Sequence, residues 1–240
     1  MDKRVREPKK PASRKSQAIG LVLMTLLLIA VYFYADWRAD QGGKGDFIVT
    51  EDADGVQTAA TVEPTPEQTG FVATDYVQID IENYGSITAE LYGEEAPITV
   101  ENFMGLVDEG FYDGLTFHRI ISDFMIQGGD PLGNGTGGSD KKIKGEFASN
   151  GVENDISHTR GTLSMARSSA NDSASSQFFI MHGDADYLDG NYAAFGRVLS
   201  GIEVVDDIVK NTPTTDSNGT VRSANQPKIV SIKRIEKPAA

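Results

Sequence analysis

The stretch Phe117-His118-Arg119-Ile120-Ile121-Ser122-Asp123-Phe124-Met125-Ile126-Gln127-Gly128-Gly129-Asp130 decides the fold. Its first five residues are bulky or β-branched in a run too short for a helix, which predicts a strand. A polar break, Ser122-Asp123, interrupts the run, and a second apolar run follows it. That second run ends at Gly128-Gly129, where the backbone can turn tightly. The stretch therefore predicts two short strands in close succession.

Two polar side chains lie within these apolar runs. Arg119 carries a charge that it cannot lose, and burying such a group without a partner is costly. Gln127 is neutral and can both donate and accept hydrogen bonds. Two interpretations remain open on the residues alone. Either these are core strands with a salt-bridged arginine, or they form a pocket wall in which a cation and an amide lie beside Phe124 and Met125.

The stretch closely resembles the signature of the cyclophilin-type peptidyl-prolyl isomerases. Three further blocks match that family in the same order along the chain. The first is Gly133-Asn134-Gly135-Thr136-Gly137-Gly138, the second joins Gly161-Thr162-Leu163-Ser164-Met165-Ala166 to Ser176-Gln177-Phe178-Phe179-Ile180, and the third joins Leu188-Asp189-Gly190 to Phe195-Gly196-Arg197-Val198. The resemblance covers residues 74–236. Four ordered blocks are far more specific than one short motif.

The patterning predicts many short strands and two helices, hence an antiparallel barrel or sandwich with helical caps. We expect helices from Pro97 to Gly110 and over 202–209, and a hairpin that turns at residues 84–86. Strands are expected at 77–81, 87–91, within 117–129, and at 162–166, 177–181, 193–199 and 228–235. A glycine-rich surface loop is expected from the end of the central strands to about residue 160. The family resemblance implies a more specific form, a mainly β, closed eight-stranded antiparallel β-barrel capped by two α-helices.

The resemblance also implies a site. Its catalytic residues are Arg119, which donates to the prolyl nitrogen and its carbonyl, and Gln127, which orients the peptide and Arg119 together with Gln177. The backbone of Ala166 binds the residue before proline. The implied substrate-binding residues are Phe124, Met125, Ala166, Arg167, Gln177, Phe179, Tyr187, Leu188 and Tyr192. No cofactor and no metal is implied.

Three of these positions depart from the family's usual pattern. Arg167 stands where an asparagine is common, and the loop after it is one residue longer. Tyr187 replaces a tryptophan, which weakens the expectation of tight cyclosporin binding more than that of catalysis. Tyr192 replaces a histidine and can still donate a hydrogen bond and pack its ring.

The N-terminal part of the chain predicts a membrane anchor. Residues 1–17 form a basic tail, and residues 18–35 are an uncharged apolar run with an aromatic cluster near its far end. Such a run is close to the minimum for crossing a hydrocarbon core, and the basic flank predicts a cytoplasmic N-terminus. The alternative is a cleaved signal peptide and a secreted protein, although residues 35–40 make a poor cleavage site. Residues 36–73 read as a flexible linker, with an extra strand at 46–50 as the alternative.

Composition excludes several classes of function. The formal net charge is −13 over 240 residues, and there is no cysteine. The absence of cysteine rules out disulfides, a thiol nucleophile and thiolate metal ligands. Because residues 1–40 carry eight basic and four acidic residues, the remainder has a net charge of −17, which would repel nucleic acid.

Other motifs favour structural roles. Gly133, Gly135 and Gly138 fit the spacing of a dinucleotide fingerprint, but polar loop follows them instead of a helix. The three histidines have no metal-ligand spacing. His118 is expected to point away from the face that carries Arg119 and to be hydrogen-bonded. The serine-rich run over 167–176 is interpreted as a loop, and no serine is expected to pair with a histidine and an acid.

These observations predict a membrane-anchored, extracytoplasmic peptidyl-prolyl cis-trans isomerase that accelerates the folding of secreted or surface proteins. Its partners would be proline-containing polypeptides and the membrane, and we expect a monomer. The alternative is a peptide-binding chaperone module with incidental or no isomerase activity. A cation among the pocket residues favours the enzyme, because binding alone does not require one.

Overall fold

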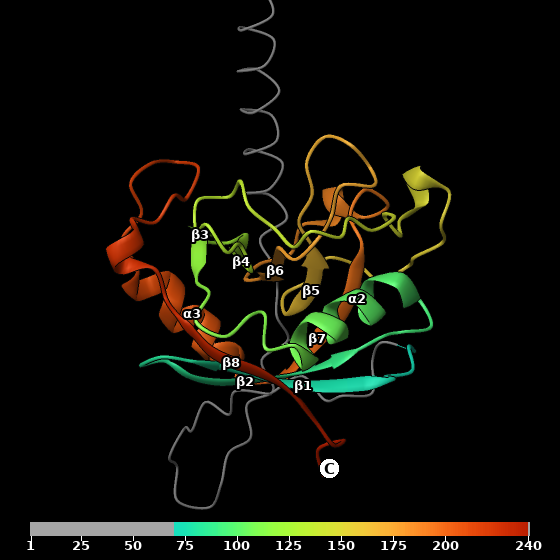
Figure 1. Ribbon diagram of the computed structural model, residues 1–240, viewed down its shortest axis with the longest axis horizontal. Helices are drawn as coiled ribbons and strands as arrows, with labels where there is room; N and C mark the ends of the chain where they lie inside the picture. The colour runs from blue at the N-terminus through green and yellow to red at the C-terminus, as the bar shows by residue number, and fades with distance from the viewer. Residues whose placement is uncertain (1–69, 240) are drawn as a thin grey trace, which may run out of the picture. The chain divides into compact units, whose positions relative to one another are not determined.

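The computed structural model describes residues 70–239 (Figure 1). The predicted tail, membrane anchor and most of the predicted linker lie outside these residues. Within the described part, neither α-helix is long and apolar enough to cross a membrane.

The described residues form a mainly β fold, in which one antiparallel sheet of eight strands curves into a half-barrel accompanied by two α-helices. Neighbouring strands in the sheet follow the order β3-β4-β6-β5-β7-β2-β1-β8. The strands are β1 (Asp75–Ile81), β2 (Gly85–Leu91), β3 (Phe117–Ile121), β4 (Met125–Gly128), β5 (Thr162–Met165), β6 (Phe178–Met181), β7 (Ala194–Ser200) and β8 (Ile229–Ile235). The helices are α2 (Pro97–Asp108) and α3 (Ile202–Asn211). The predicted strands and helices are therefore confirmed, with bounds shifted by a few residues.

Closure of the barrel is not established by the strand ladders. β3 and β8 are the two ends of the sheet, and no strand ladder pairs them among the described residues. The chain beside them is linked by an isolated bridge between Thr116 and Lys228 and by a few backbone hydrogen bonds. The closed form therefore stays a prediction.

The first hairpin turns earlier than expected. β2 already begins at Gly85, so the turn falls at residues 82–84. Asn83 has φ +66° there, a left-handed conformation that asparagine tolerates better than most residues. The predicted turn at residues 84–86 is therefore wrong by two residues, because Asn83 takes up the left-handed conformation before Gly85 opens β2.

The long segment after β4 is more than a surface loop. It buries Ile143, Phe147 and Glu146. The Glu146 carboxylate accepts hydrogen bonds from the backbone N–H groups of Ile98 (3.0 Å) and Thr99 (2.8 Å), in the first turn of α2. A helix N-terminus presents unpaired N–H groups and a positive dipole end, so this carboxylate caps α2. The loop is therefore anchored to the start of α2 by these two hydrogen bonds.

Candidate active site

Arg119 is held at one end of the sheet by groups from two other segments. Its register partner across the β3–β4 hairpin is Gln127, and Nη1 of Arg119 donates to Oε1 of Gln127 at 3.2 Å. Nε donates to the backbone carbonyl of Asn218 at 2.9 Å. Nη2 has no partner among the described residues. The guanidinium is therefore fixed on one side and keeps free donors on the other.

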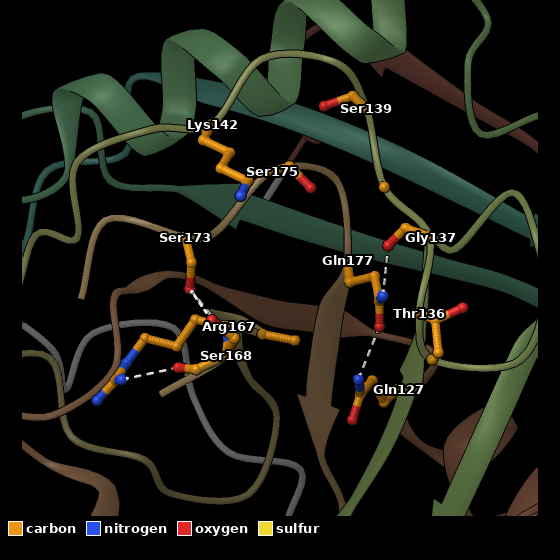
Figure 2. A pocket seen from close by; sticks show the side chains of 13 residues that line it. Gln127, Thr136, Gly137, Ser139, Lys142, Arg167, Ser168, Ser173, Ser175 and Gln177 are labelled. Atoms are coloured by element: carbon orange, nitrogen blue, oxygen red, sulfur yellow. Dashed lines mark hydrogen bonds between the residues drawn. The ribbon is translucent and has the colours of Figure 1, made fainter. Parts of the chain in front are cut away.

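The hydrogen bonds continue beyond Gln127. Its Nε2 donates to Oε1 of Gln177 at 2.9 Å, and Nε2 of Gln177 donates to the carbonyl of Gly137 at 2.7 Å (Figure 2). Each amide uses one donor and one acceptor, so the orientation of every member fixes the next. We call this set, from Asn218 through Arg119, Gln127 and Gln177 to Gly137, the amide chain.

A cavity of about 110 Å³, lined by both apolar and polar side chains, lies against Arg119. Nine of the eleven predicted site residues line it, namely Arg119, Phe124, Met125, Gln127, Ala166, Arg167, Phe179, Leu188 and Tyr192. We call it the first cavity. Met125, Phe179 and Leu188 pack in one buried apolar cluster that Phe124 and Tyr192 extend. The cavity therefore combines apolar side chains with two arginines, Arg119 and Arg167.

The other two predicted residues lie beside this cavity. Gln177 connects to it through Gln127 and lines a neighbouring cavity. Tyr187 is 61% exposed, and its ring stacks on Phe124 with the centroids 6.1 Å apart. Tyr187 thus supports a cavity wall from outside. The roles assigned to all eleven residues remain predictions.

The charge of Arg119 is not neutralised nearby. Among residues 70–239, no carboxylate lies within ion-pair distance of its guanidinium. Partial burial lowers the pKa of Arg119, while Tyr192, Tyr187 and Asp216 act to raise it. An arginine stays protonated at neutral pH even so. The interpretation of a salt-bridged core arginine is therefore wrong, and the pocket-wall interpretation holds.

Arg167 lies at the rim of the first cavity between two rings. Its guanidinium carbon is 4.9 Å from the ring centroid of Phe147 and 4.8 Å from that of Tyr192. Nε and Nη2 both donate to the carbonyl of Asn191, at 3.0 and 2.8 Å. These contacts resemble cation–π packing, which favours arginine over asparagine at this position.

A serine, a histidine and an acid do come together beneath the first cavity, contrary to expectation. His158 lies 2.7 Å from Oδ1 of Asp189 through Nδ1, and 2.9 Å from Oγ of Ser164 through Nε2. Because an ionised carboxylate only accepts, Nδ1–H donates to Asp189 and Nε2 accepts from the Ser164 hydroxyl. We call this set the buried triad. The sequence prediction failed because the three residues come from separate segments and no local motif joins them.

Neither Ser164 nor His158 of the buried triad lines the first cavity, and only Asp189 is partly exposed. Ser164 is fully buried, and His158 stacks on Phe179 with the ring centroids 6.0 Å apart. Burial lowers the pKa of His158, although the hydrogen bond to Asp189 acts to raise it. The triad therefore supports the floor of the first cavity as a hydrogen-bonded group.

The surroundings of His118 differ from the prediction of a hydrogen-bonded histidine. It is buried, and neither of its ring nitrogens has a hydrogen-bond partner among the described residues. The pairing register between β3 and β4 shifts between Phe117 and Arg119, so the strand is irregular where His118 lies. The expected hydrogen-bonded histidine is therefore not present. Burial lowers the pKa of His118.

Sequence reasoning missed the loop that carries Asn218. The Asp216 carboxylate accepts from the backbone N–H groups of Asn218 (3.0 Å) and Thr220 (3.1 Å), which tightens the loop. Gly219 has φ +78°, its N–H donates to the Asp216 carbonyl at 3.1 Å, and its carbonyl accepts from the Ile120 N–H at 2.8 Å. An Asp-Ser-Asn-Gly sequence indicates a turn. Nothing in it indicates that the turn faces Arg119.

A second cavity of about 320 Å³ adjoins the first. The two share Gln127, Ala166 and Arg167 as lining residues. The second cavity is otherwise lined by Gly135, Thr136, Gly137, Gly138, Ser139, Lys142, Ser168, Ser173, Ser175 and Gln177 (Figure 2). Its lining is far more polar than that of the first.

A cavity that places apolar side chains beside a fixed cation, next to a more polar cavity, has the form of a site for an extended peptide. The comparisons with known proteins specify the class further. The family model for the cyclophilin type peptidyl-prolyl cis-trans isomerases matches residues 76–236. The chain therefore belongs to the cyclophilin-type family and is a peptidyl-prolyl cis-trans isomerase.

Individual relatives agree with this assignment. The peptidyl-prolyl cis-trans isomerase ppi1 of Schizosaccharomyces pombe is 50% identical over 121 residues, which cover 50% of this chain and 76% of that protein. A peptidyl-prolyl cis-trans isomerase of Acinetobacter baylyi is 46% identical over 157 residues, covering 63% of this chain and 81% of that protein.

Solved structures show the same fold. A crystal structure of a cyclophilin type peptidyl-prolyl cis-trans isomerase from Cryptosporidium parvum matches with a TM-score of 0.60 at 30% identity, covering 68% of this chain and 99% of the other. A second crystal structure of that protein, in the presence of the dipeptide Ala-Pro, matches with a TM-score of 0.59 at 31% identity. It covers the same shares of the two chains.

Proposed function

We propose that the first cavity holds the proline ring of a substrate and that Arg119 stabilises the twisted X-Pro amide. The planar amide is held by resonance, which gives its rotation a barrier of about 18–20 kcal/mol. At the top of that barrier the resonance is lost and the prolyl nitrogen regains a lone pair. A hydrogen-bond donor that meets this nitrogen only in the twisted state lowers the barrier.

Some residues would hold the proline ring, and Arg119 would donate hydrogen bonds to the rotating amide. Phe124, Met125 and Phe179 offer apolar contact to a proline ring and hold it while the preceding residue rotates. Arg119 offers free donors beside that ring. Gln127 keeps the guanidinium oriented, and neither a nucleophile nor a proton exchange is required. The backbone of Ala166, which lines both cavities, would bind the residue before proline.

The observation that carries this proposal is that Arg119, with no carboxylate at ion-pair distance among the described residues, lines a cavity beside the apolar side chains of Phe124, Met125 and Phe179. A module that only bound peptides would gain nothing from a partly buried cation without a carboxylate, because such a group is costly to desolvate. In an isomerase, stabilisation of the transition state by the cation would offset this desolvation cost. The chaperone alternative gives Arg119 no comparable role.

The test is peptide exchange by NMR with the full chain in detergent micelles. Exchange between the cis and trans forms of an Ala-Pro peptide is measured with the unaltered protein, Arg119→Ala and Arg222→Ala. Arg222 is an exposed arginine outside the cavity, which makes it a matched control. We expect Arg119→Ala to lower kcat/KM roughly 10²–10³-fold, the usual cost of losing one transition-state donor, and Arg222→Ala to change nothing. Near-normal exchange by folded Arg119→Ala would overturn the mechanism, and peptide binding without accelerated exchange by the unaltered protein would favour the chaperone.

We also propose that residues 18–35 span a membrane once, with residues 1–17 in the cytoplasm and the isomerase region (residues 74–236) outside it. The support is the basic, apolar and aromatic order of the N-terminus. The proposed partners are proline-containing stretches of secreted or surface proteins, met by a monomer. Protease added to intact cells should digest the isomerase region while the protein sediments with membranes. Release of a shortened protein into the medium would instead support cleavage and secretion.

We propose further that the half-barrel closes in solution. The bridge between Thr116 and Lys228 supports closure, as do the hydrogen bonds from Phe117 N–H to the Pro227 carbonyl and from Ile229 N–H to the Leu115 carbonyl, both between the chain at β3 and the chain at β8. Slow hydrogen exchange at the amides of Phe117 and Ile229 would support closure. Exchange as fast as that of an exposed edge would contradict it.

A further inference from the structure

The second cavity differs in charge from the rest of the described chain. Residues 70–240 contain 25 Asp and Glu and 13 Lys and Arg. The cavity nevertheless has two cationic lining residues, Lys142 and Arg167, and no acidic one. In an acidic domain, a cavity that lacks carboxylates and holds cations is a local site of positive potential.

Lys142 is the cation best placed to meet a ligand in this cavity. Figure 2 shows its side chain extending from the loop, and it lines the cavity together with Ser175. No carboxylate and no hydrogen-bond acceptor among the described residues pairs with it. Arg167 is different, because the Asn191 carbonyl and two aromatic rings hold its guanidinium at the boundary between the cavities.

A hydroxyl group complements the ammonium. The side chain of Ser175 has no hydrogen-bond partner among the described residues and lies in the cavity wall (Figure 2). It occupies the space that a side chain at position 138 would need, since a Cβ on Gly138 would lie 2.2 Å from Ser175 Oγ. Glycine at this position therefore keeps the hydroxyl in the cavity as a free donor.

We propose that the second cavity binds the carboxylate side chain of an Asp or Glu in the substrate, so that this isomerase favours proline-containing peptides with an acidic residue shortly before the proline. The proposal rests on the proposed seating of proline in the first cavity. A peptide that leaves the first cavity passes the shared residues Gln127, Ala166 and Arg167 before its next side chain reaches the second. Lys142 supplies the charge, and Ser175 donates a hydrogen bond to the same carboxylate.

The experiment compares acetyl-Xaa-Ala-Pro-Ala peptides in which Xaa is Glu, Gln or Lys, with the full chain. We expect kcat/KM to be roughly two- to five-fold higher for Glu than for Gln, the range of an exposed ion pair, and lower for Lys than for Gln. The Glu-to-Gln ratio should fall toward one in 0.5 M salt, because salt screens exposed charges. An acetyl-Ala-Ala-Pro-Xaa series, with the charge after proline, should show a smaller ratio.

Substitutions locate the effect. Lys142→Gln should bring the Glu-to-Gln ratio to about one, and Lys142→Glu should reverse the order so that the Lys peptide is preferred. Lys141→Gln is the matched control, because Lys141 is the neighbouring exposed lysine and does not line the second cavity. It should leave the ratio as it is. A ratio of one in the unaltered protein, or a ratio that survives Lys142→Gln or falls equally in Lys141→Gln, would overturn the proposal.

The two proposals fail in different ways. If no peptide is exchanged faster than in buffer, the proposed mechanism in the first cavity fails. The charge preference is then measured as the ratio of dissociation constants for the Glu and Gln peptides by NMR titration, with Lys142→Gln and Lys141→Gln alongside. That ratio supports or overturns the second cavity's role without any turnover.

Discussion

The amide chain and the buried triad lie on neighbouring parts of the first cavity, and they differ in whether their polar groups are satisfied. In the buried triad, the ring nitrogens of His158 meet Asp189 and Ser164 at 2.7 and 2.9 Å. In the amide chain, Arg119 spends Nε and Nη1 on protein groups and keeps Nη2 free of described partners. Composition would assign chemistry to the triad, since serine, histidine and aspartate make a familiar catalytic set. The geometry instead assigns the chemistry to the amide chain, because its Arg119 retains free donors beside the first cavity.

The largest effect is expected from a substitution that disrupts the buried triad. His158→Ala removes a buried ring from beneath Phe179 and leaves the Ser164 hydroxyl and the Asp189 carboxylate without their partner. We expect the free energy of unfolding to fall by about 3 kcal/mol, from lost packing and unsatisfied polar groups together. Urea unfolding followed by circular dichroism measures it.

The same variant tests which role the triad has. At a temperature where His158→Ala is still folded, we expect the kcat/KM for an Ala-Pro peptide to change far less than in Arg119→Ala, because His158 reaches the cavity only through Phe179 and Tyr192. Unchanged stability together with a loss of activity as large as that of Arg119→Ala would contradict the comparison and make the triad part of the chemistry.

A smaller effect is expected from interrupting the amide chain. Gln177→Leu keeps the approximate volume of the side chain but removes the acceptor for Gln127 and the donor to the Gly137 carbonyl. Arg119 would keep its bonds to Asn218 and Gln127 while Gln127 gains freedom to rotate. We expect kcat/KM to fall about tenfold, because orientation at the reacting group is lost without loss of the donor itself.

The matched control for this change is Gln226→Leu. Gln226 also bridges loops, since its Nε2 donates to the carbonyls of Gly133 (2.8 Å) and Val221 (3.0 Å), but it lines neither cavity. It should lower stability and leave kcat/KM unchanged. Equal losses of activity in Gln177→Leu and Gln226→Leu would show that loop anchoring in general matters, and that the amide chain has no special role.

The parts of this comparison were not equally predictable from sequence. Arg119 and Gln127 flank the polar break of one hairpin at nearly equal distances, so their cross-strand pairing follows from local pattern. Strand and helix positions also followed from apolar periodicity and from Pro97 at the helix start. These are short-range features, and the chain encodes them where they occur.

The long-range partners could not be predicted in the same way. Asn218 is 99 residues from Arg119, and Asp189 is 31 residues from His158. Each lies in a loop whose turn residues can be recognised in the sequence. The position of that loop in the fold depends on the packing of the whole sheet. His118 shows the limit within a strand, because the strand pattern predicted its position but not that its ring nitrogens would have no described partner.

The smallest effect concerns pH and sharpens the contrast between buried and open groups. Burial lowers the pKa of both His118 and His158 in the folded protein, the Asp189 hydrogen bond opposing this at His158. Their unfolded pKa is about 6.5. As the pH falls below that value, the unfolded chain binds protons that the folded chain resists, so the stability present above pH 6.5 is lost as the pH falls toward the folded pKa values. Each histidine can contribute at most about 1.4 kcal/mol between pH 7.5 and 5.5, a window that lies above the unfolded pKa of the carboxylates.

His118→Gln removes the contribution of one histidine without breaking any described hydrogen bond. Urea unfolding at the two pH values should therefore show a smaller difference in the free energy of unfolding for this variant than for the unaltered protein. An equal difference in the two proteins would mean that His118 takes up its proton in the folded state as easily as in the unfolded chain, and that its burial without a partner has no electrostatic cost.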